Sequence, residues 1–197
     1  MTQLNLPTFL TLIRLIVSPL ALPLLFVYFL PFNILWINCA LAIIFLLMSL
    51  TDFFDGYLAR RYKQETQIGK LLDPIADKFL VFSSLIALLT INKIYFYWVI
   101  ILIGREFFVM GLRLIALEHQ LNVPVSYLGK LKTVLQITYI TFVIINPYQA
   151  LGFTKAASWN AFEALLLAAT LLISLLSAKR YYHGFMKVFR VPLEKKL

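Results

Sequence analysis

Four aspartates stand close together in a chain that is otherwise poor in acidic residues. The 197-residue sequence has nine acidic residues, and four of them, Asp52, Asp55, Asp73 and Asp77, lie within 26 positions. The first two are three residues apart and the last two are four apart, so on a helix each pair lies on one face. If the two helices are antiparallel neighbours, four carboxylates converge in a small volume.

Such a cluster predicts a metal site, because crowded carboxylates repel one another and lose water at a membrane edge. Oxygen ligands alone suit hard divalent ions, so we predict Mg²⁺ or Mn²⁺, with Ca²⁺ as an alternative. Four acids can hold two ions, an arrangement that suits displacement at phosphorus. The other interpretation is a solvated rim of ion pairs with four neighbouring basic residues, Arg60, Arg61, Lys70 and Lys78.

Small residues and an arginine lie among these acids. Gly56 and Ala59 follow Asp55, and Gly69 precedes Asp73. Small side chains let a bulky ligand approach the backbone, although a single glycine in a membrane helix more often serves helix packing. The planar guanidinium of Arg60 can bind a diphosphate through two parallel hydrogen bonds, or it can be an ordinary positive residue at the membrane surface.

The composition indicates a membrane protein. Hydrophobic residues make up 61% of the chain, charged residues only 14%, and the mean hydropathy is +0.86, whereas a soluble domain carries about 25% charged residues. We predict an all-α integral membrane protein, one domain over residues 1–197. Its six-transmembrane-helix bundle would span about 10–29, 33–58, 71–90, 94–117, 127–145 and 157–177.

The basic residues predict the orientation. With the N-terminus inside, 16 of the 18 Lys and Arg residues fall on the inner side, and only Lys93 and Lys155 on the outer side. We therefore expect a multi-pass protein with both termini and the aspartates on the cytoplasmic side. The net charge of +9 does not indicate nucleic-acid binding, because no soluble basic module is present. The tail Lys179–Leu197 is expected to be an interfacial helix on anionic membrane lipids.

The segment Thr51–Asp77 resembles the signature of the CDP-alcohol phosphotransferase family. All eight signature residues are present at every spacing: Asp52, Asp55, Gly56, Ala59, Arg60, Gly69, Asp73 and Asp77. The resemblance implies that family's fold, a six-helix membrane bundle that is usually a homodimer, with a cavity open to the cytoplasm. It also implies that Asp52, Asp55 and Asp73 bind metal, and that Asp77 is the catalytic base and a shared metal ligand. The site for the CDP-linked lipid would then be lined by Asp52, Gly56, Ala59, Arg60 and Gly69.

Three further segments are similar to the bacterial branch of this family that makes phosphatidylglycerophosphate. They are NLPTFLTLIR (Asn5–Arg14), GREFFVMGLR (Gly104–Arg113) and SYLGKLKT (Ser126–Thr133). This resemblance implies CDP-diacylglycerol as the donor, sn-glycerol 3-phosphate as the acceptor, and the bacterial inner membrane as the location. Family members that use inositol phosphate, serine or phosphatidylglycerol share the aspartate signature, so those acceptors stay open.

Four basic residues predict a pocket for a phosphorylated acceptor. Arg105 lies about 15 Å of helix from Tyr95, which is about half a bilayer, and an ionised group at that depth is a functional candidate. Arg113 follows two turns later, and Lys130 and Lys132 open the next span. The alternatives are that Arg105 pairs with Glu106 or a polar group of a neighbouring helix, and that the lysines only mark the inner side.

A divalent-cation transporter is the main competing class, because it too carries carboxylates inside the membrane. Transporters usually place their ion sites near the midplane, on broken helices of repeated halves. Here the acids lie near one edge of the predicted spans and no half-repeat is evident. A structural scaffold is also disfavoured, since a scaffold has no use for crowded aspartates. The sequence thus favours an enzyme.

Overall fold

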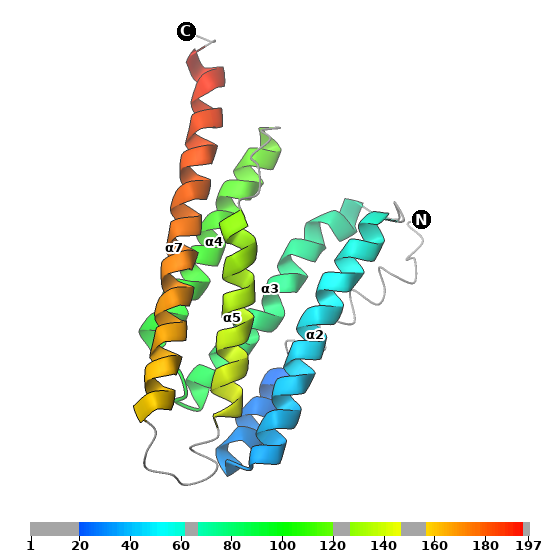
Figure 1. Cartoon of the computed structure of the whole chain (residues 1–197). Helices are drawn as coiled ribbons and strands as arrows, with labels where there is room; N and C mark the ends of the chain where they lie inside the picture. Colours follow the sequence, from blue (N-terminus) through cyan, green and yellow to red (C-terminus); the bar gives the residue numbers. More distant parts are fainter. Residues whose placement is uncertain (1–19, 62–66, 120–126, 147–156, 195–197) are drawn as a thin grey trace. The chain divides into compact units, whose positions relative to one another are not determined.

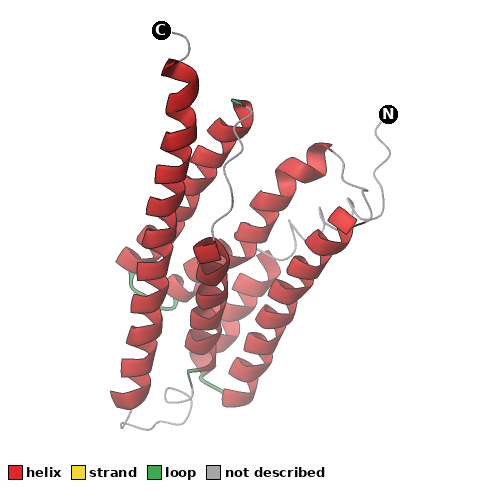
Figure 2. Cartoon of the chain, turned by 45° about the horizontal axis from the view of Figure 1, so that its top comes forward, coloured by secondary structure: helices red, strands yellow, loops and turns green. Residues whose placement is uncertain are grey.

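The computed structural model describes the backbone of residues 20–61, 67–119, 127–146 and 157–194, and the side chains of 20–50, 78–116, 118–119, 127–146 and 159–189. The described residues form helices and no strand (Figures 1 and 2). Residues 20–29 are helical and lead into the short 3-10 helix η1. The elements are η1 (Leu30–Phe32), α2 (Leu35–Arg61), α3 (Gln67–Thr90), α4 (Phe96–Glu118), α5 (Tyr127–Ile145) and α7 (Ala157–Glu194).

The helices agree closely with the predicted spans, with one correction. The bounds of α5 coincide with the predicted span 127–145, and α2, α3 and α4 differ from theirs by a few residues. The last span was expected to end near Ser177, but α7 continues as one helix to Glu194. Its extension carries an apolar stripe, Ala178, Tyr181 and Phe185, that is buried. That burial favours continuing the helix over forming a separate one.

Two of the described helices are long and apolar enough to cross a membrane, judged by length and composition. These are Tyr127–Ile145 and the segment Trp159–Phe189 within α7. Shorter apolar helical segments cover Leu20–Phe32, Leu35–Leu50 and Lys78–Thr90. The all-helical class is confirmed, and the count of six spans stays a prediction.

The contacts divide the chain into two units, and the first comprises residues 1–94 and 140–156. In its described part, α2 buries Asn38, Leu41, Ala42 and Phe45, which follow helical spacing. The ring of Phe45 lies 6.4 Å from that of Phe26 on the preceding helix. The first unit is thus built on an apolar core of helices.

The C-terminus of α3 is set by a local hydrogen-bonding motif. Asn92 adopts a left-handed backbone conformation with φ of 58°. Its amide donates to the Leu89 carbonyl, and the Lys93 amide donates to the Leu88 carbonyl. This pair of bonds is a Schellman motif, which satisfies carbonyls that the helix would otherwise leave open.

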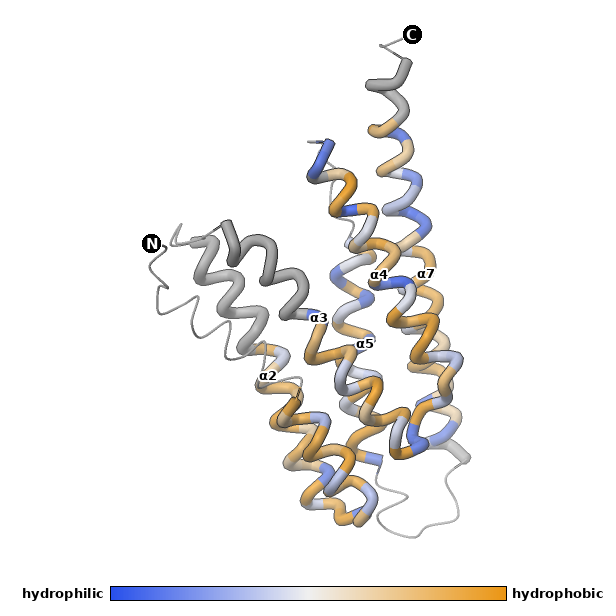
Figure 3. The backbone as a smooth tube through the Cα atoms, turned by 180° about the vertical axis from the view of Figure 1, so that it is seen from behind, coloured by the Kyte–Doolittle hydropathy of each residue, from blue (hydrophilic) through white to orange (hydrophobic). Residues whose placement is uncertain are grey.

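The second unit comprises residues 95–139 and 157–197. Here α4 and α7 run in the same direction, because successive residues of α4 meet successive residues of α7: Val109 packs with Ala178 and Tyr181, and His119 lies against Phe189. α5 runs opposite to α7, since Gly129 lies beside Ser177, whereas Leu135, later in α5, accepts a hydrogen bond from Thr170, earlier in α7. Figure 3 shows hydrophilic residues gathering toward the C-terminal ends of α4 and α7.

Candidate functional site

The four aspartates lie on two neighbouring helices of the first unit. Asp52 and Asp55 belong to α2, Asp73 and Asp77 belong to α3, and the two helices pack against each other. Asp55 is six residues before the end of α2 at Arg61, and Asp73 is six residues after the start of α3. Helices joined by so short a connection are antiparallel, so the two acidic pairs stand at the same level, about 9 Å of helix from the connection.

The side chains of this region lie outside the described residues. This applies to all eight signature residues, Asp52, Asp55, Gly56, Ala59, Arg60, Gly69, Asp73 and Asp77. Among the residues whose side chains are described, no group of three or more His, Cys, Asp or Glu residues gathers as a metal site would require. The backbone register and the carboxylate donors fit a hard divalent ion, for which oxygen ligands are preferred.

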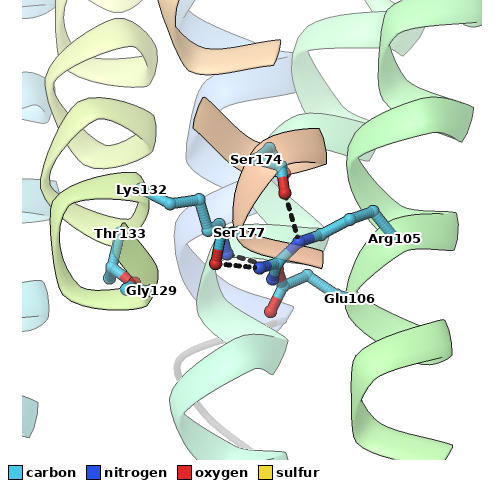
Figure 4. Close-up of polar contacts among 7 residues, drawn as sticks. All are labelled: Arg105, Glu106, Gly129, Lys132, Thr133, Ser174 and Ser177. Carbon is cyan, nitrogen blue, oxygen red and sulfur yellow. Dashed lines mark hydrogen bonds and ion pairs between the residues drawn. The ribbon is translucent and has the colours of Figure 1, made fainter. Parts of the chain in front are cut away.

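A buried ion cluster occupies the second unit, and Figure 4 shows its members. The Glu106 carboxylate accepts hydrogen bonds from Arg105 Nη1 and from Lys132 Nζ, both to the same oxygen, Oε1. The three residues come from α4 and α5 and are 4–8% exposed, so the cluster is shielded from solvent. When all three are ionised, two cations share one carboxylate, and the cluster carries a net positive charge.

Two serines of α7 complete the surroundings of Arg105. Its Nε donates to the Ser174 carbonyl at 2.9 Å, and its Nη2 donates to Ser177 Oγ at 2.8 Å. An added Cβ at Gly129 would lie 3.7 Å from Ser177 Oγ, so α5 passes close to α7 at this level. The guanidinium is therefore fixed by contacts to its own helix and to α7, with Lys132 of α5 beside it.

The cluster contains two of the four basic residues predicted to bind an acceptor. Arg105 and Lys132 meet at Glu106, and the pairing of Arg105 with Glu106 that the sequence left open is present. Arg113 is half-buried two turns further along α4, and Lys130 is exposed on α5. Within the described residues, the hydrogen bonds of the cluster include neither Arg113 nor Lys130.

Sequence reasoning missed Ser174 and Ser177. The signal was present: two serines three residues apart interrupt the apolar run of the last span and share a helix face. One turn deeper, Gln136 of α5 and Thr170 of α7 are also buried. Gln136 Nε2 and Ser174 Oγ have no hydrogen-bond partner in the described part of the chain, so the polar seam between α5 and α7 extends past the ion cluster.

The chain is similar to a known family along most of its length. The family model described as CDP-alcohol phosphatidyltransferase matches residues 4–177. A CDP-diacylglycerol–glycerol-3-phosphate 3-phosphatidyltransferase of Salmonella choleraesuis (strain SC-B67) is 36% identical over 185 residues, which cover 90% of this chain and 96% of that protein. A protein of the same name from Rickettsia typhi is 42% identical over 147 residues, covering 72% and 77%. Another from Sodalis glossinidius is 36% identical over 151 residues, covering 74% and 79%.

Proposed function

This chain belongs to the CDP-alcohol phosphatidyltransferase family, and from that premise we propose that it transfers the phosphatidyl group of CDP-diacylglycerol to sn-glycerol 3-phosphate. The products are phosphatidylglycerophosphate and CMP. The observation that carries the proposal is the similarity, over 96% of its length, to a Salmonella protein named for this reaction. The acceptor is further supported by Arg105 and Lys132, two buried cations that meet at Glu106 and whose N–H groups suit a phosphate.

We propose that the aspartates hold divalent metal, Mg²⁺ or Mn²⁺, as two ions. Asp52, Asp55, Asp73 and Asp77 would be the ligands, and their placement at one level of α2 and α3 supports this assignment. When bound, such ions supply electrostatic stabilisation of the negative charge that develops on the diphosphate and on the departing CMP. Gly56, Ala59 and Gly69 let the CDP group approach the helices, and Arg60 pairs with the diphosphate.

The chain's own residues then carry the proton and position the acceptor. Asp77 takes the proton from the C1 hydroxyl of sn-glycerol 3-phosphate as that oxygen attacks the phosphorus on the lipid side. The new P–O bond forms as the bond to the CMP oxygen breaks. Arg105 and Lys132 bind the acceptor's phosphate, and Arg113 and Lys130 attract it more weakly from outside the cluster.

We propose a bacterial inner-membrane location, with both termini and the active site cytoplasmic, and assembly as a homodimer. The orientation is supported by the basic residues, 16 of 18 on one side of the predicted spans. The homodimer rests on the family resemblance alone. Cross-linking of the purified protein in membranes and in detergent tests the oligomer, and a monomer in both would exclude it.

Release of CMP tests the function directly. Full-length protein in detergent is given CDP-diacylglycerol and Mg²⁺ with one acceptor at a time: sn-glycerol 3-phosphate, inositol phosphate, serine or phosphatidylglycerol. We expect turnover only with sn-glycerol 3-phosphate, abolished in Asp77→Asn. Turnover with another acceptor would keep the phosphatidyl transfer and reject the acceptor. Absence of turnover with all four would reject the reaction and direct attention to ion flux.

A further inference from the structure

We propose that Glu106 is a positioning residue that assembles Arg105 and Lys132 into one receptor for the acceptor's phosphate. The inference rests on the proposed function and deepens it, because it names the group that sets the geometry of the acceptor pocket. Glu106 itself is not proposed to touch substrate. Its carboxylate lies between the two cations and accepts a hydrogen bond from each.

The first reason is that the two cations come from different helices. Arg105 is on α4 and Lys132 is on α5. Two positive groups at one buried place repel each other, and the lysine has a long flexible stem that can turn away. A single carboxylate oxygen that accepts from both overcomes the repulsion and holds the ammonium beside the guanidinium.

The second reason is the way in which the guanidinium is held. A guanidinium has five N–H donors in one plane. Glu106, the Ser174 carbonyl and Ser177 Oγ receive bonds from Nη1, Nε and Nη2 respectively, so each of the three nitrogens is tied to the protein. Because three contacts fix the plane, the N–H groups they do not use have a set direction. A planar fork of set direction suits bidentate binding of a phosphate.

The test compares three variants of the full-length protein in detergent. Glu106→Gln keeps the size of the side chain and removes its charge, and Glu106→Asp keeps the charge and shortens the reach. Glu118→Gln is the matched control, since it makes the same change on the same helix at an exposed residue. For each variant, CMP release gives kcat and the KM of both substrates. Thermal unfolding with increasing sn-glycerol 3-phosphate measures acceptor binding without turnover.

We expect Glu106→Gln to raise the KM for sn-glycerol 3-phosphate about tenfold or more, as expected when a charged hydrogen-bonding partner is lost. The KM for CDP-diacylglycerol should stay within about twofold. The concentration of acceptor needed to raise Tm should increase in parallel. Glu106→Asp should fall between wild type and Glu106→Gln, and Glu118→Gln should match wild type within about twofold.

Two outcomes would overturn the inference while leaving the proposed function intact. One is an equal change in both KM values or in folded yield alone, which would make Glu106 structural. The other is a lower KM for sn-glycerol 3-phosphate in Glu106→Gln, which would make the carboxylate a competitor of the phosphate. If wild-type protein instead transfers only to a non-phosphorylated acceptor, the proposed function fails first, and the receptor role fails with it.

Discussion

The two charged regions of this chain, the aspartates of α2 and α3 and the ion cluster around Glu106, differ in how their charges are compensated. On α2 and α3, four carboxylates of the same sign stand at one level of two antiparallel helices, with no opposite charge built into the signature except Arg60. On α4 and α5, a carboxylate accepts hydrogen bonds from two cations, and one of these cations, Arg105, also donates to serine groups of α7. Under the proposed function, divalent ions from solution relieve the repulsion of the first region. In the second region, the carboxylate pairs with cations of the chain itself.

The difference corresponds to the ligands proposed for the two regions, cations for the first and an anion for the second. Crowded carboxylates attract small divalent cations, which no side chain replaces. A cluster in which opposite charges already meet has fixed donors and binds an anion by geometry as well as by charge. Removal of the ion should therefore disable the first region entirely, whereas single substitutions should weaken the second in graded steps.

Removal of divalent metal by chelation should have the largest effect on the rate of CMP release. We expect EDTA to abolish CMP release, and excess Mg²⁺ or Mn²⁺ to restore it, whereas Zn²⁺ should not, because four carboxylates without His or Cys suit hard ions. The measurement is the rate of CMP release after dialysis and after addition of each metal. Full activity in EDTA would remove the basis for the contrast between the two regions.

Substitution of the aspartates should come next. Asp77→Asn is expected to lower kcat about 10²–10⁴-fold, the range for loss of a general base. Asp73→Asn should be comparably damaging, and the double variant should lose little beyond either single variant if the two act as one unit. Steady-state kinetics at saturating metal make the comparison. Losses that multiply would indicate that the carboxylates act independently.

Lys132→Met should have a smaller effect, directed at one substrate. It leaves Arg105 and Glu106 as a neutral buried pair, so the protein should fold, but the loss of a charged donor worth about 1.5–3 kcal/mol should raise the KM for sn-glycerol 3-phosphate about 10–100-fold. Lys130→Met, two residues earlier and exposed, should change this KM less than about threefold. Equal effects of the two would place the acceptor outside the buried cluster.

Substitution of Ser174 and Ser177 should have the smallest effects on the KM for the acceptor, and the difference between the two variants tests how the guanidinium is held. Ser177→Ala removes the hydroxyl that accepts from Arg105 Nη2, and we expect the KM for sn-glycerol 3-phosphate to rise about two- to tenfold. Ser174→Ala keeps the backbone carbonyl that accepts from Nε and should have the smaller effect. Both residues are buried on α7, so a volume effect alone would affect them alike. If the order were reversed, the guanidinium would not be held as Figure 4 shows.

The same contrast explains how much could be predicted from the sequence. The aspartate region is local: its eight residues lie within 26 positions on two consecutive helices, so spacing alone indicates the chemistry. The ion cluster is not local, because Ser174 and Ser177 are 69 and 72 positions from Arg105. Sequence spacing predicts how far Arg105 lies along its span, but it does not predict which residues of α7 pack against it.

The helices themselves were predicted well where hydropathy defines them. α5 ends where the apolar run Leu131–Ile145 ends, and it begins one turn before that run, at Tyr127, as expected. The tail after Ser177 was expected to be an interfacial helix beyond the last span, because its basic residues resemble the end of a span; it is helical to Glu194, as a continuation of α7. Among these basic residues lies an apolar stripe, Ala178, Tyr181 and Phe185, that is buried in the folded chain. Charge marks where a helix can leave an apolar layer, and it does not mark where the helix ends.

The parallel course of α4 and α7 has a mechanical consequence. Over about four turns the two helices stay in contact, from Arg105 with Ser174 to His119 with Phe189. A slip of α7 by one residue would move it about 1.5 Å and turn it by about 100°. It would carry Ser177 away from Arg105 in the same movement that separates His119 from Phe189. Because α7 is one continuous helix, a displacement of its turns at Phe189 would also displace Ser177, about 18 Å of helix away, and with it a contact of the buried guanidinium.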